Sequence, residues 1–240
     1  DSAYSWSASQ AAYGQALTIT FQDDIVIPDV THDPIIAGTS TVTINSLRIV
    51  SGGRLTTGNR FFDIDGEAGN RCLDIDGEWT TTNTTVRLVT GADTEIAGNY
   101  GDSGGGVIPF NNLTIAPGAS YTFTINTAGI AVAGDLTISA GELDTGSDRS
   151  LTVGGLTTVS ANGTLTLNAS DCGFNEGSGD AFFGLTIDEG LCDFGTATVN
   201  CGGLKLVGAN AVTGTAATII IDGFHTTGEV LNFADHTYDF

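Results

Sequence analysis

Residues 136–146 read LTISAGELDTG, and the skeleton of this stretch, Leu-x-Ile-x-x-Gly-x-Leu-x-x-Gly, returns along the chain. Residues 185–195 (LTIDEGLCDFG) match it without a gap, and residues 47–58 (LRIVSGGRLTTG) match it with one extra residue. Partial or looser copies occupy residues 113–123, 156–167 and 204–214. Within a copy, apolar residues that alternate with period two indicate a strand, and the glycine that follows indicates a turn before the next strand.

The copies from residue 113 onward begin at unevenly spaced leucines, namely Leu113, Leu136, Leu156, Leu185 and Leu204. An irregular period with a fixed local pattern is typical of a solenoid. We therefore predict an all-β fold, a parallel β-helix (β-solenoid) with irregular coils of about 20 residues. Stacked strands lie about 4.7–4.9 Å apart, so ~9–11 coils would give a rod roughly 45–55 Å long, with the five leucines in one inward ladder.

The pattern also predicts three parts of the 240-residue chain. Residues 41–221 form the β-solenoid, and residues 1–40 form an N-terminal cap or docking segment. Residues 222–240, which add further aromatic side chains, form a C-terminal cap or the start of a further domain. Open solenoid ends need cover, so non-repeat caps are expected at both ends.

The charge balance limits the partners of this chain. Seven basic residues face 28 acidic ones, which gives a formal net charge of −21. No basic patch is available to neutralise several phosphates, so we expect no nucleic-acid partner, and anionic membranes would repel the chain. No apolar run is long enough to cross a bilayer. Cationic partners, divalent cations and a high-salt habitat are compatible with this charge.

A shorter repeat supplies the candidate metal ligands. Residues 58–67 (GNRFFDIDGE) and 69–78 (GNRCLDIDGE) each carry Asp-Ile-Asp-Gly. Because residues i and i+2 of a strand share a face, each pair of carboxylates points the same way. If the halves stack, four carboxylates converge, and hard cations such as Ca²⁺ bind such oxygens. The candidate ligands are Asp63, Asp65, Asp74 and Asp76, with Ca²⁺ as the only candidate cofactor; the alternative is a solvated acidic face neutralised by Arg60 and Arg71.

Two of the four cysteines, Cys192 and Cys201, are predicted to be buried free thiols. Cys192 aligns with Leu143 and Leu55, and Cys201 aligns with Val153, so both occupy positions that are apolar in other copies. The alternatives are a disulfide between Cys192 and either Cys172 or Cys201, or, least favoured, a metal site, for which Cys-x-x-Cys spacing is absent.

Two motifs suggest catalysis but lack the rest of a catalytic site. Residues 101–105 (GDSGG) resemble the nucleophile motif of chymotrypsin-like proteases, but the required histidine context is missing. His32 beside Asp33 lies at an Asp-Pro turn, where neighbouring residues point to opposite faces. Residues 172–184 lengthen one coil into a lateral loop, and we expect Phe174, Phe182 and Phe183 to anchor that loop on the core or to contact a ligand.

The Leu-Thr-Ile-x-x-Gly-x-Leu pattern of residues 107–221 resembles the Gly/Thr-rich repeats of phage virion proteins (tail fibres, tailspikes and capsid-surface fibres) and of bacterial surface adhesins. The resemblance implies a parallel β-helix in an oligomer on a virion or outside the cell. With no catalytic constellation visible, we expect a non-enzymatic structural protein, a rigid element of a virion or cell-surface assembly used for spacing and attachment. Its partners would then be other copies of itself or virion proteins. The alternative is a carbohydrate-binding or polysaccharide-degrading tailspike-like protein that contacts a host-surface glycan.

Overall fold

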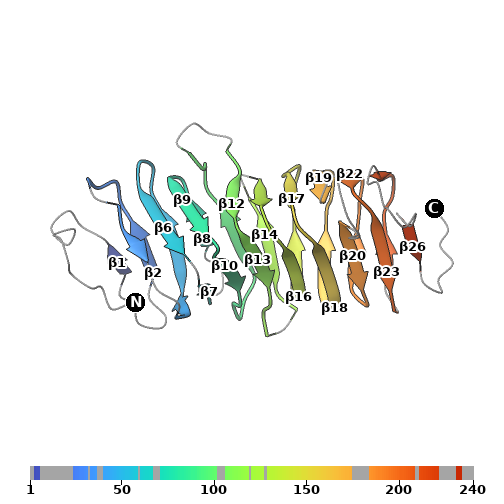
Figure 1. Cartoon of the computed structure of the whole chain (residues 1–240), viewed down its shortest axis with the longest axis horizontal. Helices are drawn as coiled ribbons and strands as arrows, with labels where there is room; N and C mark the ends of the chain where they lie inside the picture. Colours follow the sequence, from blue (N-terminus) through green and yellow to red (C-terminus); the bar gives the residue numbers. More distant parts are fainter. Residues whose placement is uncertain are drawn as a thin grey trace.

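The protein is an all-β, parallel β-solenoid of about 8 turns. The computed structural model describes residues 3–5, 24–31, 33–36, 40–58, 60–66, 71–101, 106–118, 120–126, 129–174, 184–208, 211–221 and 231–233. Figure 1 shows the strands stacked one after another along the long axis, from β2 near the N-terminus to β23 near the C-terminus. The fold class predicted from the sequence is therefore confirmed.

Each turn passes through three stacks of parallel strands, here called ladders 1, 2 and 3. Ladder 1 contains β4 (Val42–Ile44), β7 (Phe61–Ile64), β10 (Thr85–Leu88), β13 (Asn112–Ile115), the first halves of β16 (Leu136–Asp144) and β18 (Thr157–Thr166), β20 (Leu185–Asp188), β23 (Leu204–Val207) and β26 (Leu231–Phe233).

Ladder 2 contains β1 (Ala3–Ser5), β2 (Asp24–Ile27), β5 (Ser46–Ile49), β8 (Arg71–Ile75), β11 (Thr94–Ala97), β14 (Thr122–Ile125), the second halves of β16 and β18, β21 (Leu191–Asp193) and β24 (Ala211–Thr213). Because β16 and β18 run unbroken around the corner, ladders 1 and 2 form one 17-stranded sheet within the described residues.

Ladder 3 forms two separate sheets within the described residues. The first contains β3 (Ile35–Ile36), β6 (Arg54–Gly58) and β9 (Glu78–Thr82). The second contains β12 (Ile108–Phe110), β15 (Ile130–Val132), β17 (Leu151–Val153), β19 (Asp171–Phe174), β22 (Thr198–Cys201) and β25 (Thr218–Ile221). Parallel pairing also extends into both predicted caps, because β1 to β3 lie within residues 1–40 and β26 lies within residues 222–240.

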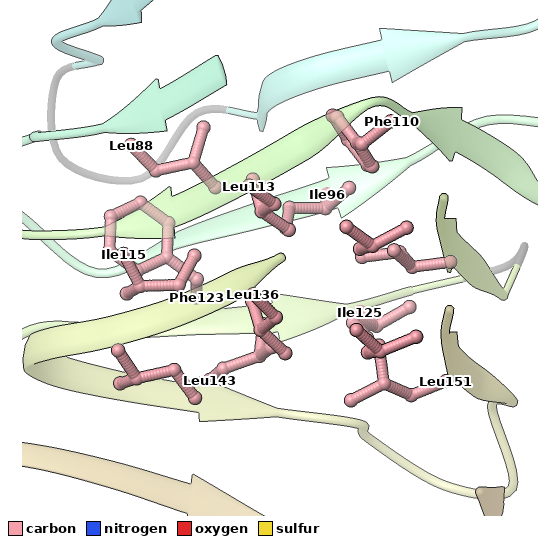
Figure 2. Close-up of a cluster of buried hydrophobic side chains, with 14 of the residues drawn as sticks. Leu88, Ile96, Phe110, Leu113, Ile115, Phe123, Ile125, Leu136, Leu143 and Leu151 are labelled. Atoms are coloured by element: carbon pink, nitrogen blue, oxygen red, sulfur yellow. The ribbon is translucent and has the colours of Figure 1, made fainter. Parts of the chain in front are cut away.

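Inward-facing aliphatic side chains stack in register along the whole rod. One column on ladder 1 consists of residues that are at most 1% exposed: Ile44, Ile64, Leu88, Ile115, Ile138, Val159, Ile187 and Leu206. Side chains of ladders 1, 2 and 3 meet in the interior, as Figure 2 shows for the middle of the rod. The core is therefore one continuous cluster, and each fully buried aliphatic side chain stabilises it by about 1.5–3 kcal/mol.

Trp79 fills the core where ladder 3 passes from one sheet to the other. Its indole ring packs edge-on against Phe62 at 5.7 Å and Phe110 at 5.8 Å between ring centroids. The indole nitrogen donates a hydrogen bond to Oγ1 of Thr57 at 3.2 Å, so this buried donor is satisfied.

The corners of the repeat share one turn chemistry. Gly146 and Gly195 have positive φ angles of 63° and 52°, which favour glycine. Oδ1 of Asp144 accepts a hydrogen bond from the Gly146 amide at 2.7 Å, and Oδ1 of Asp193 does the same for Gly195 at 3.0 Å. The Asp-x-Gly ending of the repeat therefore encodes the turn between ladder 2 and ladder 3.

The structure corrects the alignment of two copies of the repeat. Leu156 is not in the inward ladder: Thr157 pairs with Leu136 and Leu185, while Leu156 takes the corner position next to Asp135, whose Oδ1 accepts its amide hydrogen at 2.9 Å. Residues 47–58 run from ladder 2 to ladder 3 rather than from ladder 1 to ladder 2, so Leu55 shares no column with Leu143.

The expected number of coils is also corrected. The aligned coils differ in length, since the step from Val159 to Ile187 is much longer than the step from Ile187 to Leu206. Longer coils leave fewer full turns for the same chain, so the expected ~9–11 turns become about 8. The ten described strands of ladder 2 are separated by nine spacings of about 4.8 Å, which makes the rod ~43 Å long.

Candidate functional site

The two halves of the acidic repeat lie on different ladders. Asp63 belongs to β7 on ladder 1, whereas Asp74 belongs to β8 on ladder 2. The repeat thus covers two sides of one coil instead of two stacked coils. The structure therefore does not bring the four aspartates together on one surface.

Asp63 is paired with an arginine from the next coil. Arg87 on β10 lies in register with Asp63 and donates from Nε and Nη2 to the two carboxylate oxygens, at 2.6 and 2.5 Å. The guanidinium also lies over the ring of Phe61, 4.6 Å from its centroid. Only 12% of the Asp63 side chain is exposed. This bidentate, ring-backed pair fixes one carboxylate of the repeat as a cross-coil contact.

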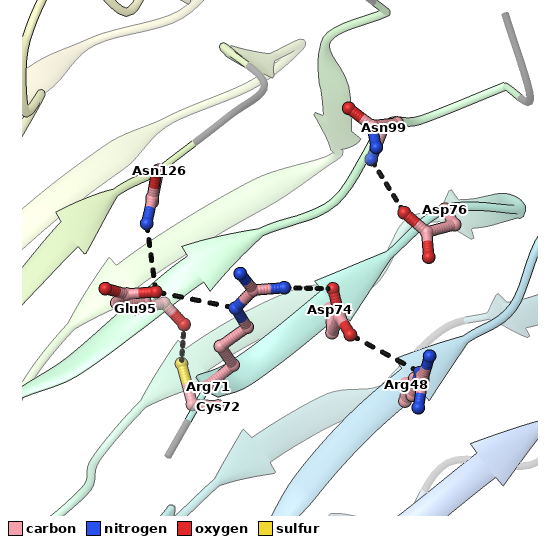
Figure 3. A network of polar contacts seen from close by, with 8 residues as sticks. All are labelled: Arg48, Arg71, Cys72, Asp74, Asp76, Glu95, Asn99 and Asn126. Atoms are coloured by element: carbon pink, nitrogen blue, oxygen red, sulfur yellow. Dashed lines mark hydrogen bonds and ion pairs between the residues drawn. The ribbon is translucent and has the colours of Figure 1, made fainter. Parts of the chain in front are cut away.

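Asp74 is the centre of a second ion-pair network, shown in Figure 3. Its carboxylate contacts Nε of Arg48 at 3.4 Å and Nη1 of Arg71 at 3.1 Å. Arg71 also reaches Glu95 at 3.4 Å, and the side-chain amide of Asn126 donates to Glu95 at 3.0 Å. The network therefore joins four successive coils of ladder 2, from β5 to β14.

The other predicted residues have separate environments. Asp65 is exposed, and Asp76 accepts a hydrogen bond from the Asn99 amide at 2.9 Å. Of the two arginines expected to neutralise the acidic row, Arg71 does so, while Arg60 is 7% exposed and donates to the Gly58 carbonyl at 3.3 Å. In the part of the chain that the structure describes, no three His, Cys, Asp or Glu side chains are grouped so that they could hold a metal ion. Calcium binding by this repeat stays a prediction.

A groove of about 770 Å³ runs along ladder 2 over the ion-pair network. Short side chains of Val26, Ser46 and Thr94 line it together with the charged ones. The pairing of β8 with β11 shifts its register between Glu95 and Ile96, and the side chain of Cys72 on β8 is 1% exposed. The charged residues along the groove are Asp24, Arg48, Arg71, Asp74, Asp93 and Glu95.

This groove is the candidate functional site, because polar groups of both signs gather in a hollow large enough for a small ligand. A smaller hollow of about 430 Å³ on ladder 3 is lined by uncharged residues, among them Pro109, Ala131 and Thr152. Sequence reasoning missed Asp24, Arg48, Asp93 and Glu95 as parts of a site. The sequence shows that each of these residues is charged and lies within or beside a strand. It does not show that they lie next to one another, because that depends on the lengths of the coils that separate them.

Cys192 and Cys201 are buried thiols, as predicted, and Cys72 and Cys172 are buried thiols as well. Cys192 shares a column with Leu143 through Leu165, and Cys201 shares one with Val153 through Phe174. Burial raises the pKa of Cys72 and of Cys172 to about 12, and it raises the pKa of Cys192 further. These three thiols stay protonated and unreactive in the folded protein, so they are core residues rather than nucleophiles.

Several predictions fall partly or wholly outside the described residues. Residues 102–105 of the GDSGG motif, His32, Phe182 and Phe183 belong to this group. Phe174 is described and is fully buried, so it anchors the start of the 172–184 segment on the core. Among the described residues there is no helix that is long and apolar enough to span a membrane.

Comparison with protein-family models, with curated proteins and with solved structures finds no match to this chain. The proposals that follow therefore rest on the chain's own residues and geometry.

Proposed function

We propose that this chain is a non-enzymatic structural protein, a rigid β-helical element of a virion (a fibre or capsid decoration) or of a cell-surface assembly. It acts as a spacer and attachment element on the virion surface or outside the cell. Its partners are other copies of itself or other subunits of the same assembly.

The observation that carries this proposal is the uninterrupted aliphatic column from Ile44 to Leu206, in which each side chain is at most 1% exposed. Interiors packed in this way have low compressibility. A stack in which every coil contacts both neighbours through strand pairing and side chains resists bending, which is the property that a spacer needs.

Cross-coil polar contacts on the surface support the same function. Oε2 of Glu142 accepts a hydrogen bond from Thr122 on the preceding coil at 3.0 Å, and Oε1 accepts one from Thr166 on the following coil at 2.5 Å. Asn168 donates to Asp144 across coils at 2.6 Å. Carboxylates that would otherwise only repel one another thus connect successive coils. The net charge of −21 opposes contact between the flanks of separate rods and leaves contacts with partner subunits to the ends of the rod.

The test is assembly of the full chain and of a variant that lacks residues 1–16. The full chain should enter a filament or particle seen by electron microscopy, and the deletion should abolish incorporation while far-UV circular dichroism stays β-rich. Unchanged assembly after the deletion, or robust turnover of a polysaccharide by the isolated chain, would overturn the proposal.

A second candidate function is carbohydrate binding, and the groove on ladder 2 specifically favours it. Sugars present hydroxyl groups that both donate and accept hydrogen bonds. The groove offers carboxylate acceptors, guanidinium donors and the hydroxyls of Ser46, Thr122 and Thr124. A rod used for attachment would then hold its host-surface glycan along this face.

A further inference from the structure

We infer that the groove on ladder 2 selects neutral oligosaccharides over acidic ones, and that Asp24 and Asp93 are the residues that set this selectivity. The inference rests on the second candidate function, glycan binding in this groove. It adds the chemical class of the ligand and the side chains that decide it.

The centre of the groove is electrically balanced. Arg48 and Arg71 contact Asp74 at 3.4 and 3.1 Å, and Arg71 also contacts Glu95 at 3.4 Å. Two guanidinium groups therefore meet two carboxylates, and neither arginine carries an unpaired charge that would attract an acidic ligand. An anionic sugar could gain a partner here only by displacing a carboxylate that is already in place.

Asp24 and Asp93 add two negative charges that no described basic residue pairs with. Oδ1 of Asp24 accepts hydrogen bonds from Asn45 and Ser46, both at 2.7 Å, and Oδ1 of Asp93 accepts one from the Thr122 amide at 2.9 Å. All of these donors are neutral, so they orient the carboxylates without cancelling their charge. The lining therefore carries two positive and four negative groups, and the excess repels an acidic ligand.

A neutral sugar disturbs none of these contacts. Its hydroxyls can accept from the guanidinium N–H groups that the ion pairs leave over and can donate to the remaining carboxylate lone pairs.

The binding groups are held in place before a ligand arrives. Glu95 is fixed from β14 by Asn126, Asp93 from β14 by the Thr122 amide, and Asp24 from the following coil by Asn45 and Ser46. Each contact joins two coils that the buried core already fixes relative to each other. Preorganisation of this kind limits the entropy lost on binding.

The experiment applies the full chain to a glycan array that carries neutral, uronate-bearing and amino-sugar oligosaccharides. The strongest neutral ligand and its uronate counterpart are then titrated at low salt. Two like charges in a groove of this size should weaken the uronate by at least ~10-fold relative to the neutral sugar. The difference should shrink at high salt, because ionic screening removes most of the repulsion.

The double variant Asp24→Asn with Asp93→Asn tests the assigned residues. It keeps the side-chain shape and an acceptor oxygen at each position while removing both charges, so the affinity ratio of neutral to acidic sugar should fall by at least ~5-fold. The control is Glu78→Gln, which removes a carboxylate that pairs with Arg54 on ladder 3, outside the groove, at 3.1 Å. It should leave the ratio unchanged, and melting curves check that both variants are folded.

Each result that differs from these expectations shows which part of the inference is wrong. Equal binding of neutral and uronate sugars, or an unchanged ratio in the double variant, would overturn the selectivity while glycan binding stands. Preference for amino sugars would show that the acidic excess outweighs the arginines and would overturn the ligand class. Binding to none of the glycans would overturn both the inference and the second candidate function, and would leave the structural function untouched.

Discussion

Replacing Thr157 by valine should stabilise the protein, because the hydroxyl of Thr157 is buried without a partner. Thr157 has an exposed fraction of 0%, and its backbone lies in register with Leu136 on one side and Leu185 on the other. The Oγ1 atom of Thr157 is buried and has no hydrogen-bond partner. It is the only buried side-chain oxygen or nitrogen atom in this situation in the described part of the chain. Both neighbouring copies of the repeat have leucine at this level of the ladder.

The magnitude follows from the desolvation of one hydroxyl. An unpaired buried hydroxyl costs ~1–3 kcal/mol in protein mutational data, and valine has the same branched shape with a methyl group in its place. Valine also suits a strand. We expect Thr157→Val to raise the free energy of unfolding by ~1–2 kcal/mol, which for a chain of this size raises Tm by roughly 2–8 °C.

Thr145→Val is the matched control with the opposite sign. Thr145 is equally buried, but its hydroxyl donates to the Leu167 carbonyl at 2.8 Å and accepts from the Ser170 hydroxyl at 2.9 Å. Valine at this position removes both hydrogen bonds and leaves the buried Ser170 hydroxyl without its acceptor, while the Leu167 carbonyl keeps the hydrogen bond from the Ser170 amide at 3.0 Å. We therefore expect a loss of ~1–3 kcal/mol. Both variants are followed by thermal and urea denaturation with far-UV circular dichroism. A Thr157→Val protein that is no more stable than the wild type, beside a destabilised Thr145→Val protein, would refute the reasoning.

Three further predictions concern the ion pair, the acidic repeat and the thiols. Arg87→Gln should lower the free energy of unfolding by ~1–2 kcal/mol, because it leaves the mostly buried Asp63 carboxylate unpaired. Adding Asp63→Asn to this variant should restore part of the loss. If the effects of the two substitutions simply add in the double-mutant cycle, the two side chains are not energetically coupled. A calcium site at the acidic repeat predicts that Ca²⁺ raises Tm, that a chelator reverses the effect, and that Asp65→Asn with Asp76→Asn abolishes it; melting that ignores Ca²⁺ would leave arginine pairing as the role of the repeat. Burial raises the folded-state pKa of Cys72 and of Cys172 to about 12, whereas the ordinary value of 9.0 applies to the unfolded chain. Their contribution to the free energy of unfolding is therefore present below pH 9.0 and is lost as pH rises from 9.0 toward 12. Because all four cysteines are at most 2% exposed, a thiol-reactive dye should label none of them before unfolding, and rapid labelling of the native protein would contradict their burial.

The sequence was sufficient for the fold class and for the local geometry of the repeat. Period-two alternation identifies inward positions, and glycine after an aspartate identifies the corner, as Asp144 and Gly146 show. These signals lie within a few residues of one another, so they do not depend on the rest of the chain. The same local alignment placed Cys192 and Cys201 correctly in apolar columns.

What the sequence did not predict was the ladder on which each segment lies. The second Asp-Ile-Asp-Gly segment looks like a stacked copy of the first, yet β7 and β8 occupy adjacent sides of the same coil. Leu156 looks like a repeat leucine, yet Thr157 takes the inward place. The groove likewise required Asp24, Arg71 and Asp93, which are far apart in the sequence.

By itself, therefore, the sequence determined that the chain alternates short strands and glycine corners, that these strands stack as a parallel solenoid, and that Cys192 and Cys201 face inward. Only the tertiary structure decided the register between coils, the arginine partners of the aspartates and the position of the groove. The physical reason is that strand partners come from successive coils of unequal length, as the steps from Val159 to Ile187 and from Ile187 to Leu206 show. The lengths of the corner segments determine which residues of successive coils pair, and the local alternation of apolar and polar residues does not predict those lengths.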